Sequence, residues 1–174
     1  MSSLMGERGM PRLKFPHAPL PTVAGLWDCP TVINNVETYA CAPFIIQNGG
    51  EWYATIGAST KNSKGTKIFS VSGHVNKPGN YEVEFGTTLM ELLAMAGGMK
   101  GGTLKACVPG GSSVPILNRE MTEKAVIGYE EMVEVGSMVG SGGCMFLNEH
   151  SCIVTFIWRT SLFYARESCG KCTP

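Results

Sequence analysis

The sequence lacks an excess of charge of either sign. Among its 174 residues, 14 lysines and arginines balance 14 aspartates and glutamates, and charged residues make up only 16% of the chain. Proteins that bind nucleic acid or other polyanions over a broad surface usually carry a concentrated positive charge. The balance therefore argues against a general nucleic-acid-binding surface, whereas the hydrophobic content of 44% predicts a globular chain with its own core.

Long apolar runs are missing as well. The longest apolar stretch, residues 153–164, contains Arg159 and is shorter than the roughly 20 apolar residues that a membrane-spanning helix needs. We therefore expect no direct membrane span, and we expect any work at a membrane to proceed through partner proteins. We also expect no signal peptide. The seven cysteines are odd in number and scattered, which favours a reducing compartment over a disulfide framework.

What the sequence does contain is a C-x-x-C motif near its C-terminus, formed by Cys169 and Cys172. Two thiolates at this spacing can bind one metal, but a zinc site or a cubane iron–sulfur cluster needs four ligands. We expect the remaining ligands beyond Pro174 or on another chain. The spacing alone leaves zinc, an iron–sulfur cluster, a redox pair and ordinary thiols open. A redox pair normally opens a helix, whereas this motif follows a stretch of helical length.

The N-terminal part has two contrasting segments. Residues 1–30 contain five prolines and predict an extended arm that is ordered only on a larger surface. Residues 31–48 predict a helix with Thr31 as its N-cap, an interruption at Pro43 and a stop at the following glycines. Asn34 and Asn35 are poor helix formers near its start. Their amides either cap the helix or bind a polar ligand beside free backbone N–H groups.

The middle of the chain predicts a small β-grasp-like module. Ile68, Val71 and Val75 lie in a strand-rich run, a turn is expected at 76–79, and further strands are expected over residues 81–85 and 104–108. Thr88 and Glu91 form a capping box that begins a helix ending near residue 95. The glycine-rich turn at 109–113 could cradle a phosphate, but it lacks the lysine and the spacing of a P-loop.

The C-terminal part predicts a short helix, a strand over residues 144–147 and a helix over 151–166 that leads into the C-x-x-C motif. We interpret His74 as structural. The remaining five cysteines are interpreted as buried small hydrophobic residues: Cys29, Cys41, Cys107, Cys144 and Cys152.

Several motifs, taken in order, carry a resemblance to a known family. They lie at residues 25–27, 30–38, 65–69, 72–79, 109–113, 136–138, 140–143, 163–164 and 167–174. Together they resemble the NADH-oxidising flavoprotein subunit of respiratory complex I, a subunit type that also occurs in NAD-linked hydrogenases and formate dehydrogenases. The resemblance covers nearly the whole chain from about Pro11.

The resemblance implies an α+β fold in three parts. Residues 1–64 would be the end of an FMN- and NADH-binding domain, residues 65–120 a β-grasp module of the soluble ligand-binding (SLBB) type, and residues 121–174 a connector and the first helix of a helical 4Fe–4S domain. The family's glycine-rich flavin segment and its last two cluster cysteines have no counterpart here. The chain therefore looks like the central and early C-terminal part of such a subunit only.

The resemblance also assigns site residues. Asn34, Asn35 and Thr38 match positions that line the FMN site, and Cys169 and Cys172 match the first two 4Fe–4S ligands. No catalytic side chain is assigned. Residues 14–21 are longer than the family's compact Lys-Pro-Pro-Phe-Pro run and rearranged relative to it, so no NADH contact is carried over.

The implied function is electron transfer from NADH through FMN to a 4Fe–4S cluster and onward towards quinone, with the isolated chain itself inactive. The implied partners are other peripheral-arm subunits, notably a 2Fe–2S thioredoxin-like subunit. The implied location is the cytoplasmic side of a bacterial inner membrane, or the matrix side in a mitochondrion. The alternative is a stand-alone β-grasp docking module with a structural zinc or no metal.

Overall fold

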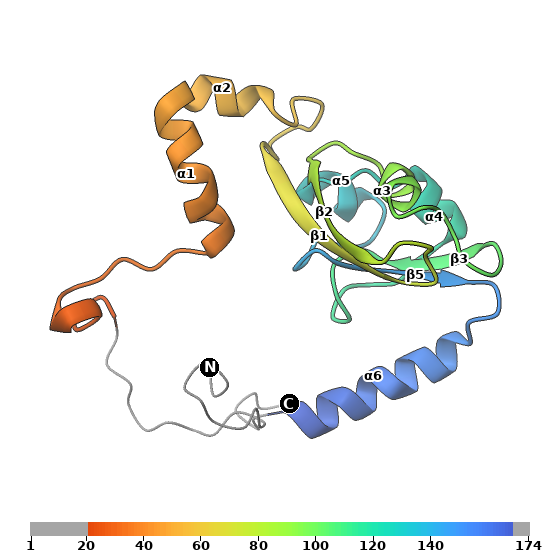
Figure 1. Ribbon diagram of the computed structural model, residues 1–174. Coiled ribbons are helices and arrows are strands. Elements are labelled where there is room, and N and C mark those ends of the chain that lie inside the picture. Colours follow the sequence, from red (N-terminus) through yellow and green to blue (C-terminus); the bar gives the residue numbers. More distant parts are fainter. Residues whose placement is uncertain (1–20, 169–174) are drawn as a thin grey trace. The chain divides into compact units, whose positions relative to one another are not determined.

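The computed structural model describes residues 21–168 (Figure 1). Its described part divides into a compact unit of Val36–Ser151 and a second unit that contains residues 21–35 and 152–168. A short 3-10 turn at Leu26–Asp28 precedes the regular elements. In chain order these are α1 (Val36–Asn48), α2 (Gly50–Thr55), β1 (Thr66–Gly73), β2 (Gly79–Glu84), α3 (Leu89–Met95), β3 (Leu104–Val108), β4 (Leu117–Asn118), α4 (Arg119–Lys124), α5 (Tyr129–Glu134), β5 (Gly143–Asn148) and α6 (Ile153–Glu167).

The strands form one mixed sheet in the order β2-β1-β5-β3-β4. β1 pairs antiparallel with β2 and parallel with β5, whereas β3 is antiparallel to both β5 and β4. The first and last strands are thus parallel neighbours at the centre, which is the arrangement of a β-grasp module. The strands predicted around β1, β2, β3 and β5 are all confirmed. The sheet runs on to Asn148, past the boundary expected at residue 120, because β5 fills the place between β1 and β3.

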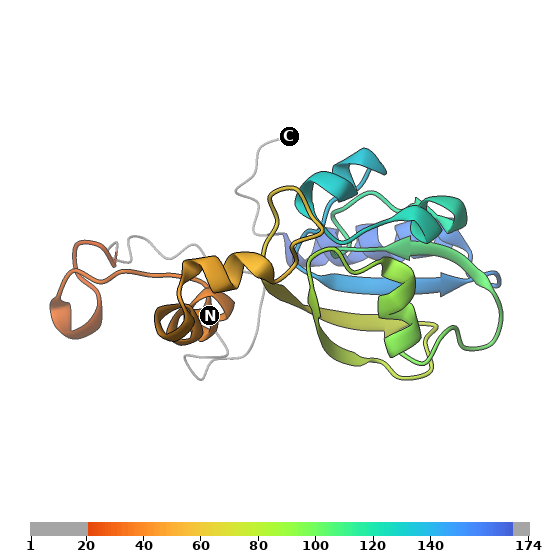
Figure 2. The same cartoon turned by 90° about the horizontal axis from the view of Figure 1, so that it is seen from above.

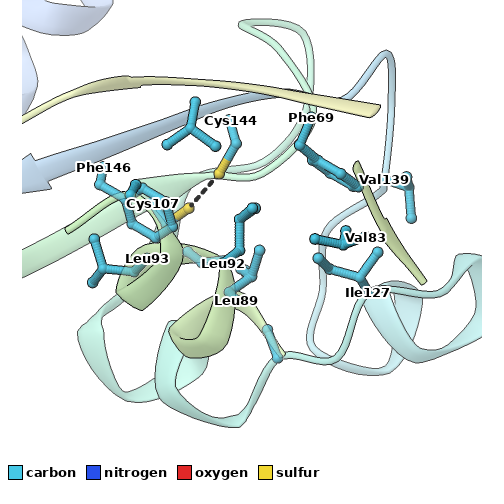
Figure 3. Packing of buried hydrophobic residues seen from close by; sticks show 14 of the residues in the cluster. Phe69, Val83, Leu89, Leu92, Leu93, Cys107, Ile127, Val139, Cys144 and Phe146 are labelled. Carbon is cyan, nitrogen blue, oxygen red and sulfur yellow. Dashed lines mark hydrogen bonds between the residues drawn. The ribbon is translucent and has the colours of Figure 1, made fainter. Parts of the chain in front are cut away.

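One face of the sheet carries the core. Along β1, Phe69 and Val71 are buried while Ile68 and Ser70 are exposed, so alternate residues face the core. Helices α3, α4 and α5 lie on the core side of the sheet (Figures 1 and 2). Side chains from β1, β2, β3 and β5 meet the leucines of α3 there (Figure 3). The labelled members of this core are Phe69, Val83, Leu89, Leu92, Leu93, Cys107, Ile127, Val139, Cys144 and Phe146.

The predicted capping box of α3 is confirmed. Thr88 Oγ1 accepts a hydrogen bond from the Glu91 backbone N–H at 3.1 Å, and Glu91 Oε2 accepts one from the Thr88 backbone N–H at 2.8 Å. The hydrogen bonds from Thr88 lower the pKa of the Glu91 carboxyl. The helix therefore begins at the residue after Thr88, and Leu89, Leu92 and Leu93 face the core.

The predicted start of the first helix is wrong. α1 begins at Val36, because Thr31 is engaged in a turn of its own: its Oγ1 accepts from the Leu26 N–H at 2.9 Å and donates to the Cys29 carbonyl at 2.8 Å. The expected interruption at Pro43 is also wrong, because the helix continues through it and loses one backbone N–H donor. Gly49 has a φ of 91° and separates α1 from α2.

Substitution of neighbouring residues on opposite faces of β1 should separate core packing from strand propensity. Phe69 has no exposed surface, whereas 47% of Ile68 is exposed. We expect Phe69→Ala to lower the free energy of unfolding by roughly 3–5 kcal/mol, because it leaves a cavity in the core. The control Ile68→Ala should cost about 1 kcal/mol or less. Urea denaturation followed by circular dichroism measures both, and equal losses would contradict the assignment of the core face.

Candidate functional site

The residues assigned to FMN lie around the start of α1. Asn34 and Asn35 come directly before the helix, Thr38 lies in its first turn, and all three are exposed. The first backbone N–H groups of a helix have no partner within the helix. Two amides and a hydroxyl within five residues at such a helix start are the hydrogen-bonding groups that a polar cofactor requires. Their contact with FMN stays a prediction.

Glu37, which the sequence did not single out, ties this helix to the sheet. Its Oε1 accepts a hydrogen bond from the Ile68 backbone N–H at 2.8 Å, and its Oε2 lies 3.3 Å from Lys67 Nζ. Only 15% of the Lys67 side chain and 34% of the Glu37 side chain are exposed. The contact joins two of the motifs that carry the family resemblance, residues 30–38 and 65–69. No local pattern indicates that the two motifs meet.

Tyr53 of α2 lies beside this contact. A Cβ at Gly65 would lie 2.0 Å from the Tyr53 hydroxyl oxygen, and Gly65 has a φ of +86°. Both the steric clash and the left-handed backbone conformation therefore disfavour a side chain at this position. Burial raises the pKa of the Tyr53 hydroxyl, and the nearby Cys41 and Glu37 raise it further, so the phenol is neutral at pH 7. These residues together are named the α1–β1 joint: Glu37, Cys41, Tyr53, Gly65, Lys67 and Ile68.

The glycine-rich turn at residues 109–113 has a structural explanation. A Cβ at Gly110 would lie 2.1 Å from the Val139 carbonyl oxygen. The Ser141 N–H donates to the Gly110 carbonyl at 2.9 Å, and the Gly111 N–H donates to the Gly143 carbonyl at 2.7 Å. The turn is therefore packed backbone to backbone against the segment that precedes β5. These contacts account for its glycines without a phosphate.

The five other cysteines do not share one environment. Cys107 and Cys144 are buried in the core with their sulfurs 3.6 Å apart (Figure 3), as expected. Burial raises the pKa of the Cys107 thiol, and the Cys144 thiol beside it adds to the effect. The interpretation is wrong for Cys29 and Cys152, which are exposed because they lie in segments that pack outside the core, and Cys41 is half-buried.

His74 contributes to the fold through its backbone. Its N–H donates to the Phe146 carbonyl at 2.8 Å, and its ring Nδ1 lies 3.4 Å from the Ser151 hydroxyl oxygen. These contacts hold the end of β1 against β5, in agreement with the structural role expected from the sequence.

Cys169 and Cys172 lie outside the described residues. α6 ends at Glu167 with Ser168 as its C-cap, so the C-x-x-C motif follows the helix directly. Across residues 21–168, no three His, Cys, Asp or Glu side chains gather as metal ligands. In the same described part of the chain, none of the helices reaches the length and hydrophobicity that crossing a bilayer demands.

Alkylation should separate the cysteines by burial. In the native chain at neutral pH, iodoacetamide should modify Cys29 and Cys152 quickly, because both are exposed. Cys107 and Cys144 should react on the order of 100-fold more slowly, because both are buried and react only after local opening, and burial also raises the pKa of the Cys107 thiol. Mass spectrometry of proteolytic peptides measures the rates, with the urea-unfolded chain as the control. Similar rates for all four thiols in the native chain would contradict the packing.

Comparison with known proteins extends over the whole chain. Residues 68–117 match the SLBB domain family. The complete chain is 47% identical over 177 aligned residues to the NADH-quinone oxidoreductase F subunit of Rickettsia bellii (strain OSU 85-389), of which it covers 41%. It is also 47% identical to the F subunit of Mycobacterium bovis (strain ATCC BAA-935 / AF2122/97), of which it covers 38%.

The similarity to a solved structure also extends over nearly the whole chain. The fold of this chain matches that of an NAD+-reducing [NiFe]-hydrogenase in the H2-reduced state with a TM-score of 0.73 and 33% sequence identity, covering 99% of this chain and 28% of that chain. The chain spans about two fifths of the length of the curated relatives that it matches. Over its whole length, the chain is homologous to the F subunit of NADH-quinone oxidoreductase, and it corresponds to a part of that subunit.

Proposed function

We propose that this chain is part of an NADH-oxidising flavoprotein subunit that passes electrons from NADH through FMN to a 4Fe–4S cluster. The observation that carries the proposal is the extent of the identity. The 47% identity covers 100% of the chain, well beyond residues 68–117 of the SLBB domain. A chain kept only as a docking module would need to match its relatives over that domain alone. The names of the relatives and of the similar structure connect both with NADH or NAD+.

Asn34, Asn35 and Thr38 are proposed to hold FMN. Their support is the donor set described above: exposed amide and hydroxyl groups at the start of a helix of 13 residues. Side chains of this kind can donate to and accept from the polar groups of a flavin nucleotide at the same time. Bound FMN supplies the chemistry that amino acids lack, which is to accept a hydride and release single electrons.

Cys169 and Cys172 are proposed as two ligands of the 4Fe–4S cluster. The support is the donor chemistry, because two cysteines separated by two residues are a common part of cluster-binding motifs. In the sequence, the two cysteines follow α6, which ends at Glu167. The other ligands are proposed to come from outside the 174 residues, because the other five cysteines are scattered along the chain upstream.

The proposed setting follows from the same homology. Partners would be other subunits of a complex I or hydrogenase assembly, including a 2Fe–2S thioredoxin-like subunit, and the location would be the face of the membrane on which NADH is available. The β-grasp module would be the folded base that carries the FMN-side helix α1. The alternative, a docking module that binds zinc or no metal, is an outcome of the cluster experiment below.

Loss of the polar groups before and in α1 should weaken FMN binding in the intact subunit that contains this chain. We expect Asn35→Ala to raise the Kd for FMN about tenfold, because each lost hydrogen bond is worth on the order of 1 kcal/mol. The matched control is Asn48→Ala at the other end of α1, where the amide caps the Phe44 carbonyl at 2.9 Å. Titration of flavin fluorescence measures the Kd. An unchanged Kd for Asn35→Ala would reject the assigned site.

Loss of one thiolate should remove the cluster from the intact subunit. After anaerobic reconstitution, Cys172→Ser should lose the broad visible absorption and the EPR signal of a reduced 4Fe–4S centre. Cys152→Ser, at the N-cap of α6, is the matched control and should keep both signals. Tight binding of one zinc ion by the unsubstituted subunit, with no uptake of iron, would favour the docking module instead.

A further inference from the structure

The hydrogen-bonding pattern along β1 explains why Glu37 contacts this strand. In a mixed sheet, successive N–H groups of a strand point alternately to its two neighbours. The pairing of β1 with β5 begins at Ser70, whose N–H donates to the Gly142 carbonyl at 2.9 Å. Two residues earlier, the N–H of Ile68 points to the same side, ahead of the first β5 pair. Glu37 Oε1 accepts this N–H at 2.8 Å, so the carboxylate continues the ladder where β5 has not begun.

The second oxygen of the same carboxylate meets a lysine with little access to water. Lys67 Nζ lies 3.3 Å from Glu37 Oε2, and 15% of the lysine side chain is exposed. A lysine side chain with so little exposed surface is stabilised by an anionic partner, because removing a charge from water without one is costly. Glu37 thus contacts two consecutive residues of β1: it accepts a hydrogen bond from the Ile68 backbone and forms an ion pair with the Lys67 side chain. Such a two-point contact fixes both the distance and the orientation of the helix start.

Apolar packing does not replace this contact. None of the residues of α1, Val36–Asn48, is buried, and Val36 and Ile46 are more than four-fifths exposed. A helix without a buried face gains little from the hydrophobic effect at its contact with a sheet. Its orientation on the module therefore depends on polar contacts, and Glu37 lies within its first turn.

We propose that Glu37 is a positioning residue that fixes the start of α1 to β1, and that FMN binding depends on it. The inference rests on the proposed function, because Asn35 and Thr38 lie within two residues of Glu37 along the chain. A preorganised binding group loses less conformational freedom when its ligand arrives, so a fixed helix start increases affinity. Glu37 acts through α1 and is assigned no contact with the flavin.

The test uses the intact subunit with three variants. Glu37→Ala removes both contacts. Glu37→Gln keeps an oxygen that can accept the Ile68 N–H but removes the charge that pairs with Lys67. Glu51→Ala is the matched control, because Glu51 is an exposed glutamate in the first turn of the neighbouring helix α2. Hydrogen exchange at Ile68 reports on the contact, and flavin fluorescence titration reports the Kd for FMN.

We expect Glu37→Ala to speed exchange at Ile68 about tenfold and to weaken FMN binding about tenfold, which corresponds to the loss of one charge-assisted hydrogen bond. Glu37→Gln should restore most of the protection at Ile68 and should lie between the other two in FMN affinity. Glu51→Ala should change neither quantity. Far-UV circular dichroism tests whether each variant is folded. If Glu37→Ala does not fold, Glu37→Gln decides: an FMN affinity equal to that of the unsubstituted subunit rejects the proposal.

The outcomes distinguish a failure of the positioning role of Glu37 from a failure of the proposed flavin function. Faster exchange at Ile68 with an unchanged Kd means that the contact is structural only, which overturns the positioning role and leaves the flavin function intact. Unchanged exchange in Glu37→Ala overturns the contact itself. If the unsubstituted subunit does not bind FMN, the proposed function fails, and the positioning role fails with it.

Discussion

The parallel pairing of β1 with β5 is the constraint on which the rest of the described fold depends. It joins residues 70–73 to residues 143–146, the longest sequence separation between neighbouring strands of the sheet. The segment between the two strands must therefore bring the chain back to the edge of β1 that pairs with β5. Within that segment, α3 packs over one face of the sheet. The pairing also sets Cys144 opposite Val71 on the neighbouring strand, and Cys144, Phe146 and Val71 are all members of the core. A module closed in this way folds as one piece, since neither half retains a central strand pair.

The same pairing determines where irregular features occur. β5 begins at Gly143, and the segment before it packs on the glycine-rich turn after β3, where a side chain on Gly110 would collide with the Val139 carbonyl. On its other side, the late start of β5 leaves the Ile68 N–H without a strand partner, and Glu37 fills that position. The place where β5 begins therefore explains two features of the sequence in part. One is the glycine-rich turn at residues 109–113, and the other is the glutamate at the start of α1.

Local signals made much of this fold predictable. The capping box at Thr88, the β3 strand and α6 were visible from spacing of a few residues, because the interactions that define them are local. The start of α1 was missed since the Thr31 hydroxyl bonds within its own turn instead of capping a helix. The exposure of Cys29 and Cys152 and the contact of Glu37 with β1 depend on which distant segments meet, which composition and periodicity do not record. The unusual amides of Asn34 and Asn35 left helix capping and a polar ligand open, and the assignment to FMN, with Thr38, came from family resemblance alone.

The buried core and the residues assigned to cofactors lie in different parts of this chain. The buried side chains lie in the β-grasp module, whereas α1 and α6, which adjoin the residues assigned to FMN and the cluster, contain no buried residue. Large apolar residues on both helices are exposed instead, Ile46 and Val154 among them. With little hydrophobic burial to orient α1, the polar contact of Glu37 with β1 has more influence on the geometry of this helix than it would in a packed core. Changes at the α1–β1 joint can therefore alter how the assigned FMN residues are presented while the module itself stays folded.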